Sequence, residues 1–405
     1  MLALGGQTSR AAASTSFVSS LYDFSLNGQP TIVERRDGVD FFFNEFWTAR
    51  QRQAHRLHEI SYRACFKPQL PAFFIERLTA PGDRVYDPFM GRGTAPLQAA
   101  LMGRIPVGND INPLSATLTR PRLDPPRYED IIERLRTIDW LAAEDLSDDL
   151  LAFFHPRTLT QISALRAYLL HRERERTLDK VDEWIRMVAL NRLTGHSPGF
   201  FSVYTLPPNQ AVSPAAQRKI NALRDQAPPE RDVAAIILKK TRALLSDGPC
   251  PSIGEPLLLA SPAEATPEIA SGSIDLVVTS PPFLDVVQYA ADNWMRCWFV
   301  GLDPESIPIA MHRDLDEWTT LIGQVFRELV RVTRVGGCIA FEVGEVRGGE
   351  IELEWLVLAA AHDLPLVPLA VLINVQNFTK TANCWGVANN SKGTNTNRIV
   401  VLRRE

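Results

Sequence analysis

The chain has 405 residues, of which 45% are hydrophobic and 22% charged, and its formal net charge is −4. This length accommodates one large domain with an insertion, or two domains, without covalent staples. Five scattered cysteines, none of them in a CxxC pair, argue against a zinc ribbon, a disulfide framework and a thioredoxin-like redox site. No apolar run reaches the length of a membrane span and no signal-peptide pattern opens the chain, so we expect a soluble cytoplasmic protein without membrane association.

The negative net charge disfavours a dedicated nucleic-acid-binding module, which is usually basic overall. An enzyme acting on nucleic acid needs only a local positive groove. Two stretches are candidates for such a groove, and each also fits a solvated helix face: they are Arg50, Arg52, His55 and Arg56, and Lys239 with Lys240.

The first predicted αβ block covers about residues 68–113. A strand at Arg84–Tyr86 runs into a glycine-rich loop, and a helix through Gln98 follows. A second strand, Val107–Asp110, then ends in an acid. This βαβ pattern predicts a parallel sheet.

The middle of the chain, from about residue 128 to 246, has helical periodicity. The predicted helices are Ile131–Trp140, Leu159–His171, Val181–Leu193 and Val233–Leu245. Because this region separates two αβ blocks, we expect a helical insertion. The stretch Gly195–Tyr204, rich in aromatic and helix-breaking residues, either packs against the core or forms a wall of a base-binding cleft.

The second αβ block runs from about residue 257 to the end. Ile274–Thr279 is apolar on both faces, as is typical of a central parallel strand. The other predicted strands are Leu257–Leu259, Ile339–Val343, Leu366–Asn374 and Arg398–Leu402, and the predicted helices are Tyr289–Val300 and Glu317–Arg331. Together the blocks predict an α/β fold, with a mostly parallel twisted sheet, helices on both faces and a helical insertion.

The loop Asp87–Thr94, with the sequence DPFMGRGT, follows a strand and opens a helix. Open parallel sheets bind their ligands at this place, and glycines there let the backbone approach a ligand closely. The third glycine of the dinucleotide fingerprint is replaced by Ala95-Pro96, so the loop matches an NAD site weakly. Asp110, after the next strand, is placed to accept hydrogen bonds from a ribose, which suits any nucleoside-bearing cofactor.

A second motif, Thr279–Phe283 with the sequence TSPPF, follows the most apolar strand. Its two prolines fix two φ angles and remove two donors, which leaves a rigid corner of acceptor carbonyls. Acceptors of this kind help an exocyclic amine to become pyramidal as it attacks, and the aromatic ring offers a platform for a base.

These two motifs resemble those of the SAM-dependent DNA amino-methyltransferases, which have the patterns DPFxGxGT and S/D-PP-Y/F. The resemblance implies a Rossmann-like methyltransferase fold with S-adenosyl-L-methionine (SAM) as cofactor and no metal. It assigns cofactor binding to Lys67, Asp87, Pro88, Phe89, Gly91, Gly93, Thr94, Asp110, Asn112, Ser261 and Thr279. It assigns catalysis to Ser280, Pro281, Pro282 and Phe283, with Ser280 and the Pro281 carbonyl holding the amine and Phe283 stacking on the base. The family usually has an acid at the position of Ser261.

Further substrate contacts are expected from residues after the proline corner and from a segment rich in glycine and asparagine before the last strand. These candidates are Asp285, Tyr289, Trp294, Lys380, Asn383 and Lys392. The first three also fit caps or core positions, and the last three also fit a structured loop.

We expect a site-specific methyltransferase that acts on a base flipped out of double-stranded DNA. In the family, a serine before the two prolines goes mainly with cytosine N4, so Ser280 favours that target over adenine N6. An RNA base methyltransferase and a silent SAM- or DNA-binding regulator remain alternatives. A C5-cytosine methyltransferase would need a nucleophilic cysteine in a proline–cysteine loop after the fourth strand. The one proline–cysteine pair of this chain, Pro249-Cys250, precedes a strand instead, so this class is disfavoured.

We divide the chain into three parts. Residues 1–127 contain an N-terminal segment and the first half of the methyltransferase domain, with the cofactor loop at 87–94. Residues 128–250 are a helical insertion and a candidate for target recognition. Residues 251–405 are the second half, with the catalytic loop at 279–283. A cognate restriction endonuclease is a candidate partner.

Overall fold

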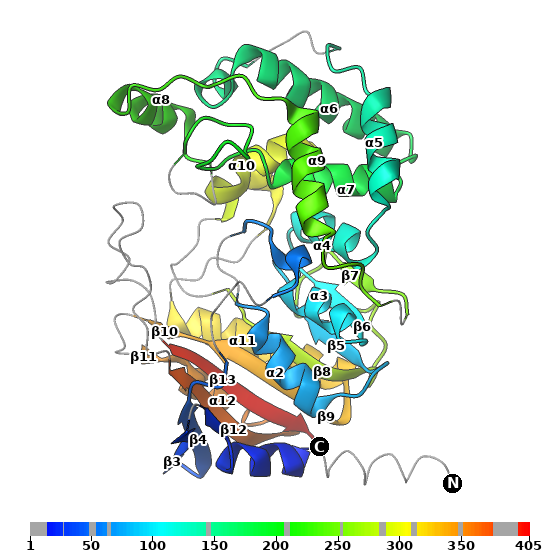
Figure 1. The fold of residues 1–405 in the computed structure, drawn as a ribbon. Helices are drawn as coiled ribbons and strands as arrows, with labels where there is room; N and C mark the ends of the chain where they lie inside the picture. The colour runs from blue at the N-terminus through cyan, green and yellow to red at the C-terminus, as the bar shows by residue number, and fades with distance from the viewer. Residues whose placement is uncertain are drawn as a thin grey trace.

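The computed structural model describes residues 14–26, 28–47, 54–62, 66–142, 147–205, 211–251, 254–282, 289–308, 314–346, 351–375 and 396–405. In Figure 1 the strands gather in the lower part of the molecule and most of the helices between residues 128 and 244 lie above them. No helix among the described residues is both long and apolar enough to cross a bilayer.

The centre of the lower part is a nine-stranded sheet in the order β3-β4-β12-β13-β9-β8-β5-β6-β7. Its strands are β3 (Ile32–Arg36), β4 (Val39–Asn44), β5 (Arg84–Asp87), β6 (Ile105–Asn109), β7 (Leu257–Leu259), β8 (Ile274–Thr279), β9 (Thr333–Val343), β12 (Leu366–Val375) and β13 (Thr396–Arg404). Five of the neighbouring pairs are parallel: β4–β12, β9–β8, β8–β5, β5–β6 and β6–β7. The predicted mostly parallel α/β sheet is therefore confirmed.

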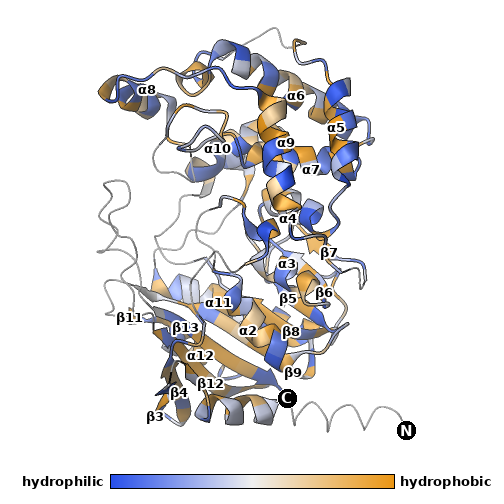
Figure 2. Ribbon diagram, in the orientation of Figure 1, coloured by the Kyte–Doolittle hydropathy of each residue, from blue (hydrophilic) through white to orange (hydrophobic). Residues whose placement is uncertain are grey.

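Helices cover both faces of this sheet, because each central strand buries side chains on both sides. On one face Val85 and Leu276 pack with α2 (Gln69–Leu78), α3 (Thr94–Leu101) and the helix over residues 14–22. On the other face Tyr86 and Val277 pack with α11 (Leu315–Val332) and α12 (Leu353–Ala361). Figure 2 shows the apolar strands sandwiched between these helices.

The chain between β6 and β7 is helical. It contains α4 (Leu114–Leu123), α5 (Tyr128–Thr137), α6 (Pro156–Arg174), α7 (Lys180–Leu190), α8 (Pro214–Leu223) and α9 (Val233–Leu244). Five of these helices, α4 to α7 and α9, share a core that includes Trp184, Leu165 and Ile237 and also takes in Leu97 of α3. The same core takes in Met295 and Phe299 of α10 (Tyr289–Val300), the helix that follows the proline motif.

The aromatic stretch before residue 205 is part of this packing. Phe200 is 8% exposed and Phe201 is fully buried. The Phe201 backbone N–H donates to the Arg192 carbonyl, and the Val203 N–H donates to the Phe153 carbonyl. Of the two interpretations of this stretch, the structure favours packing against the core.

Candidate functional site

The glycine turn leaves the carboxyl end of β5 and enters α3. Gly91 and Gly93 both have positive φ angles, of 50° and 73°. A Cβ on Gly93 would lie 2.1 Å from Thr119 Oγ1, so a side chain has neither a relaxed backbone nor space there. The fold of the turn therefore requires glycine at this position, whether or not a ligand is bound.

Asp110, just after β6, holds this turn. Its Oδ2 accepts a hydrogen bond of 2.8 Å from the Gly91 N–H, and its Oδ1 accepts one of 2.9 Å from the Asn112 N–H. Asn112 in turn accepts from the Leu114 N–H at the start of α4. Burial raises the pKa of Asp110 above its ordinary value. Each carboxylate oxygen still has a second lone-pair direction for a ligand hydroxyl.

Asp87 is the last residue of β5 and only 1% exposed. Its Oδ1 accepts hydrogen bonds from Thr279 Oγ1 at 2.7 Å and from the Phe89 N–H at 3.1 Å. Its Oδ2 is buried and has no hydrogen-bond partner within the residues that the structure describes. Burial, helped by the charges of Asp110 and Glu342, raises the pKa of Asp87 to about 7, against the lowering effect of the hydrogen bonds from Thr279 and the Phe89 N–H.

The bond between Thr279 and Asp87 joins the two sequence motifs. β5 and β8 are adjacent parallel strands, with Val85 opposite Leu276 and Tyr86 opposite Val277. Their carboxyl ends therefore meet at one edge of the sheet, where open α/β sheets bind ligands. This register places the glycine turn beside the proline corner, 192 residues away along the chain.

The proline corner itself is partly described. Ser280 is half-buried and Pro281 is buried. The Pro282 carbonyl accepts a hydrogen bond of 3.0 Å from Trp318 Nε1 of α11, which anchors the corner to a helix on the sheet. Phe283 and Asp285 lie outside the described residues, and so does the side chain of Tyr289.

Asn109, which the sequence analysis did not single out, connects the end of β7 to the site. Asn109 is fully buried at the end of β6. Its Nδ2 donates to the Ser261 carbonyl at 2.8 Å and to the Pro88 carbonyl at 3.3 Å, while its Oδ1 accepts from the Ser261 N–H at 3.0 Å. Ser261 thus lies at the same sheet edge as the glycine turn. The sequence does contain a signal that could have identified Asn109, because this residue is a polar side chain at the end of an apolar strand.

Residues 60–62 cover the glycine turn, and they too were missed. Arg92 Nη1 donates to the Ile60 carbonyl at 3.0 Å. The ring of Tyr62 is buried, and its Cε1 lies 3.7 Å from the position that a Cβ on Gly91 would take. Lys67, half-buried, comes just before α2. No pattern in the sequence distinguishes Tyr62 from a core aromatic residue.

The remaining substrate candidates do not gather at this edge within the described structure. Trp294 donates from Nε1 to the Ala211 and Val212 carbonyls, at 3.1 and 3.3 Å, inside the helical part. Lys380, Asn383 and Lys392 lie outside the described residues.

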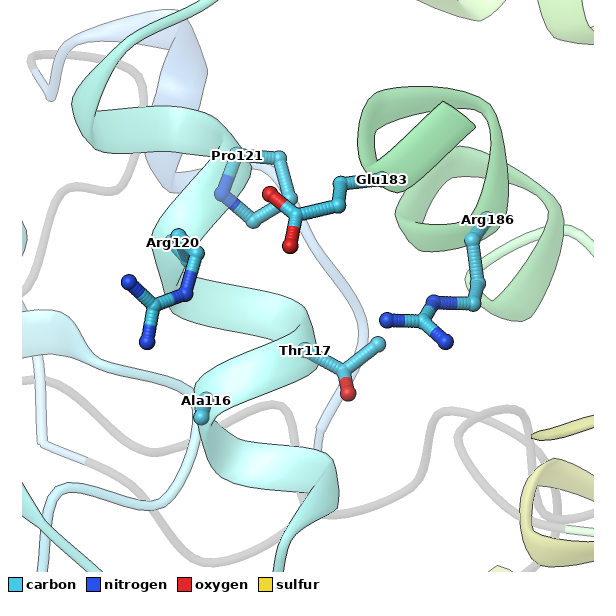
Figure 3. Close-up of a pocket in the computed structure, with 6 residues that line it drawn as sticks. All are labelled: Ala116, Thr117, Arg120, Pro121, Glu183 and Arg186. Carbon is cyan, nitrogen blue, oxygen red and sulfur yellow. The ribbon is translucent and has the colours of Figure 1, made fainter. Parts of the chain in front are cut away.

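Two hollows of the described surface lie elsewhere. One, of about 130 Å³, lies between α4 and α7 and is lined by Ala116, Thr117, Arg120, Pro121, Glu183 and Arg186 (Figure 3). The larger, of about 690 Å³, shares Arg120, Pro121 and Glu183 with it and extends to residues 249–256. None of the predicted site residues lines either hollow. Over the described ranges, no group of three or more His, Cys, Asp or Glu side chains is arranged to hold a metal ion.

The protein has an α/β fold with a mostly parallel central sheet, and its glycine turn lies at the edge where such sheets bind ligands. Residues 24–119, which contain this turn, match the family model described as DNA methylase, of the N6/N4 methyltransferase type. The predicted resemblance is thus confirmed over residues 24–119, which are similar to DNA methylases of this type. The match also supports the predicted cofactor, because methylases of this family take their methyl group from SAM.

Individual relatives agree with the family. The chain is 35% identical over 89 residues to type II methyltransferase M.MjaII of Methanocaldococcus jannaschii, a match covering 22% of this chain and 16% of that protein. It is 22% identical over 280 residues to type II methyltransferase M.BsoBI of Geobacillus stearothermophilus, covering 61% and 53%. The chain therefore spans about half, or less, of the length of these relatives.

Among solved structures, a geranyl diphosphate methyltransferase in complex with GPP and sinefungin is 10% identical, with a TM-score of 0.33 over 84% of this chain and 79% of that one. A likeness of this size supports no assignment.

Proposed function

We propose that this protein is a SAM-dependent DNA methyltransferase that methylates the exocyclic amine of a flipped base, with cytosine N4 as its preferred target. One observation carries the proposal: the Thr279–Asp87 hydrogen bond of 2.7 Å, which holds the two motifs at a common sheet edge. Methyl transfer needs this arrangement, because the methyl donor and the attacking amine must lie in line.

The residues of the edge fit the cofactor. SAM, when bound, supplies an electrophilic methyl group on a sulfonium. The unpartnered Oδ2 of Asp87 suits a ligand ammonium group, and the free lone pairs of Asp110 suit the hydroxyls of a ribose. The glycine turn offers its backbone to the ligand without a side chain in the way.

The proline corner fits the acceptor base. Ser280 Oγ and the Pro281 carbonyl accept the two N–H bonds of the amine, so that the nitrogen lone pair points at the methyl carbon. The Pro282 carbonyl is already engaged by Trp318, which keeps the corner rigid and leaves the Pro281 carbonyl to the substrate. With SAM held by the glycine turn, Asp87 and Asp110, the amine nitrogen would receive the methyl group and give up a proton to solvent. Phe283 stacks on the base.

The choice of cytosine rests on Ser280, since family members with aspartate there act mainly on adenine N6. The three-part division of the chain, with target reading by residues 128–250 or by the segment 377–397, belongs to the same proposal. So does pairing with a restriction endonuclease. An RNA substrate is the serious alternative, because the same two motifs serve RNA base methylation.

Mass spectrometry of nucleosides tests this proposal. Duplex DNA and structured RNA are each incubated with the purified protein and labelled SAM, and the modified nucleoside is identified. We expect N4-methylcytosine in DNA; label in RNA alone would remove the DNA assignment, and N6-methyladenine would correct the target base.

Two variants then test the site. Ser280→Ala should lower the methylation rate about 100-fold or more while SAM affinity stays near that of the wild type, since one preorganised acceptor is lost. Asp110→Ala should mainly weaken SAM binding. Wild-type turnover by Ser280→Ala would refute the amine-binding role.

A further inference from the structure

Arg56 and Lys240, from two basic stretches that are far apart in the sequence, lie together in the structure. Arg50 and Arg52 of the first stretch lie outside the described residues. Arg56 Nη1 forms an ion pair of 2.6 Å with Glu59 Oε1, and Lys240 Nζ forms one of 3.2 Å with Glu59 Oε2. The Arg56 backbone N–H also donates to Asp247 Oδ2, which ties this segment to the end of α9. The short helix η2 (Arg56–His58) thus places the Arg56 guanidinium beside the Lys240 ammonium group of α9.

Arg192 adds a third cation, for which the described part of the chain offers no hydrogen-bond acceptor to Nε. Its guanidinium lies over the ring of Phe200, with Cζ 4.0 Å from the centroid. Its buried Nε has no hydrogen-bond partner among the described residues. Burial lowers the pKa of Arg192 to about 10, and Glu59 opposes this. Burial and then the charge of Arg192 lower the pKa of Lys240, so these two cations lie close together.

The cluster of Arg56, Arg192 and Lys240 therefore holds three cations against two carboxylates, those of Glu59 and Asp247. The surplus positive charge remains although the whole chain carries −4. A planar guanidinium held over an aromatic ring has fewer conformations to lose, and its fork of donors suits the binding of phosphate oxygens.

The cluster adjoins the segment that covers the glycine turn. Glu59 directly precedes Ile60, whose carbonyl receives the hydrogen bond from Arg92. Arg192 directly follows Asn191, whose Oδ1 accepts from the Ser61 N–H at 2.9 Å. Both sides of the cluster are thus tied, within one or two residues, to the covering segment 60–62.

We infer that Arg56, Arg192 and Lys240 form a phosphate-binding site for the DNA backbone near the extruded base. This inference rests on the proposed function and adds to it the surface that grips the strand. The ligand is a phosphodiester, and each such contact releases counterions from the DNA. Contacts of this kind position the duplex without reading its sequence.

The test is the salt dependence of DNA binding by the full chain. Fluorescence anisotropy gives the dissociation constant for labelled duplexes of two unrelated sequences at several salt concentrations. For Arg192→Gln and Lys240→Gln we expect affinity to fall about tenfold or more on both duplexes, and the slope of log K against log salt to fall by about 0.9 per contact. Arg192→Lys should recover part of the slope, because it restores the charge without the planar group.

Arg77→Gln is the matched control. Arg77 also lies 4.0 Å from a ring centroid, that of Phe73, but it already donates to the Phe73 carbonyl at 3.1 Å and belongs to α2. It should bind DNA with the wild-type slope. Thermal unfolding and SAM binding without DNA verify that each variant is folded.

Three outcomes would overturn the inference. They are slopes for Arg192→Gln and Lys240→Gln equal to that of Arg77→Gln, a loss confined to one of the two duplexes, and inorganic phosphate binding to the cluster while both variants bind DNA normally. The last would identify a site for a free anion. If the wild type neither binds nor methylates DNA, the proposed function itself fails, and this result is distinct from the other three.

Discussion

Asp87 has a buried oxygen without a hydrogen-bond partner among the described residues, at the place where a ligand ammonium group is expected. Its pKa of about 7 in the folded protein lies above the unfolded value, so the folded state holds the extra proton between about pH 4 and pH 7. The contribution of Asp87 to the free energy of unfolding therefore falls as pH rises through this window and is constant above it. A cationic ligand group beside Asp87 stabilises the ionised carboxylate and so removes the preference of the folded protein for the protonated form.

SAM affinity should therefore rise with pH, by up to about tenfold per unit between about pH 5.5 and pH 7, and level off above. Isothermal titration in buffers of different ionisation enthalpy should detect proton release on binding at about pH 6. Asp87→Asn should bind SAM weakly and without this pH dependence. A flat affinity profile in the wild-type protein would contradict the placement of the ammonium group at Asp87.

Gly93 is a second position where one residue decides the site. Gly93→Ala should lower the free energy of unfolding by about 3 kcal/mol or more, because the positive φ angle and a Cβ placed 2.1 Å from Thr119 Oγ1 both destabilise the folded state. Gly82→Ala is the control, since Gly82 has a φ of 85° but nothing within 4 Å of its Cβ position, and should cost about 1–2 kcal/mol. Urea unfolding measures both; equal losses would mean that the Thr119 contact relaxes freely.

At the scale of elements, the helical part is held by one buried acid. Asp182 of α7 is fully buried and accepts from Arg134 of α5, from Arg172 Nε at 2.6 Å and from Tyr168 at 3.3 Å, both of α6. Three helices therefore share one carboxylate, whose removal leaves two arginines without their buried partner.

Asp182→Asn should lower the free energy of unfolding by about 3–5 kcal/mol. Asp149→Asn, in an exposed pair of 2.9 Å with Arg218, should change it by about 0.5 kcal/mol or less. Chemical denaturation followed by circular dichroism compares them. A loss of less than about 1 kcal/mol for Asp182→Asn would mean that Asp179, which also pairs with Arg134 and Arg172, and the apolar packing suffice to hold the helices together.

At the scale of the whole molecule, the N-terminal strands belong to the sheet that carries the site. β4 runs parallel to β12, and Phe42 is fully buried in the same core as Phe73, Leu276 and Val401. Asn374 of β12 reinforces this junction, because its Oδ1 accepts from the Phe46 and Trp47 N–H groups.

Phe42→Ala should therefore destabilise the protein as one unit, by about 3–5 kcal/mol. Ile32→Ala in β3, where the side chain is 63% exposed, should leave stability nearly unchanged. Thermal unfolding followed by tryptophan fluorescence should show one shifted transition for Phe42→Ala. An early separate transition, with the main midpoint unmoved, would show that the N-terminal strands fold independently of the sheet.

Local patterns were sufficient to predict the β5–α3–β6 unit, the buried strand β8 and the helices from α5 to α7, because each depends on neighbours within a few residues. Glycine, proline and apolar runs act through backbone angles and burial over that range. The hairpin of β3 and β4 was missed, although Asp37-Gly38 between two runs rich in β-branched and aromatic residues is a local hairpin signal. Only the parallel pairing of β4 with β12 depends on tertiary structure.

The sequence by itself determined that two chemical motifs follow two strands, since glycine and proline constrain the backbone wherever they stand. Only the tertiary structure decided that these strands are neighbours, that Asn109 bridges two turns, and that Arg192 joins Lys240. Those contacts connect residues 21 to 192 positions apart, and their partners depend on strand order and helix packing, which no local pattern encodes.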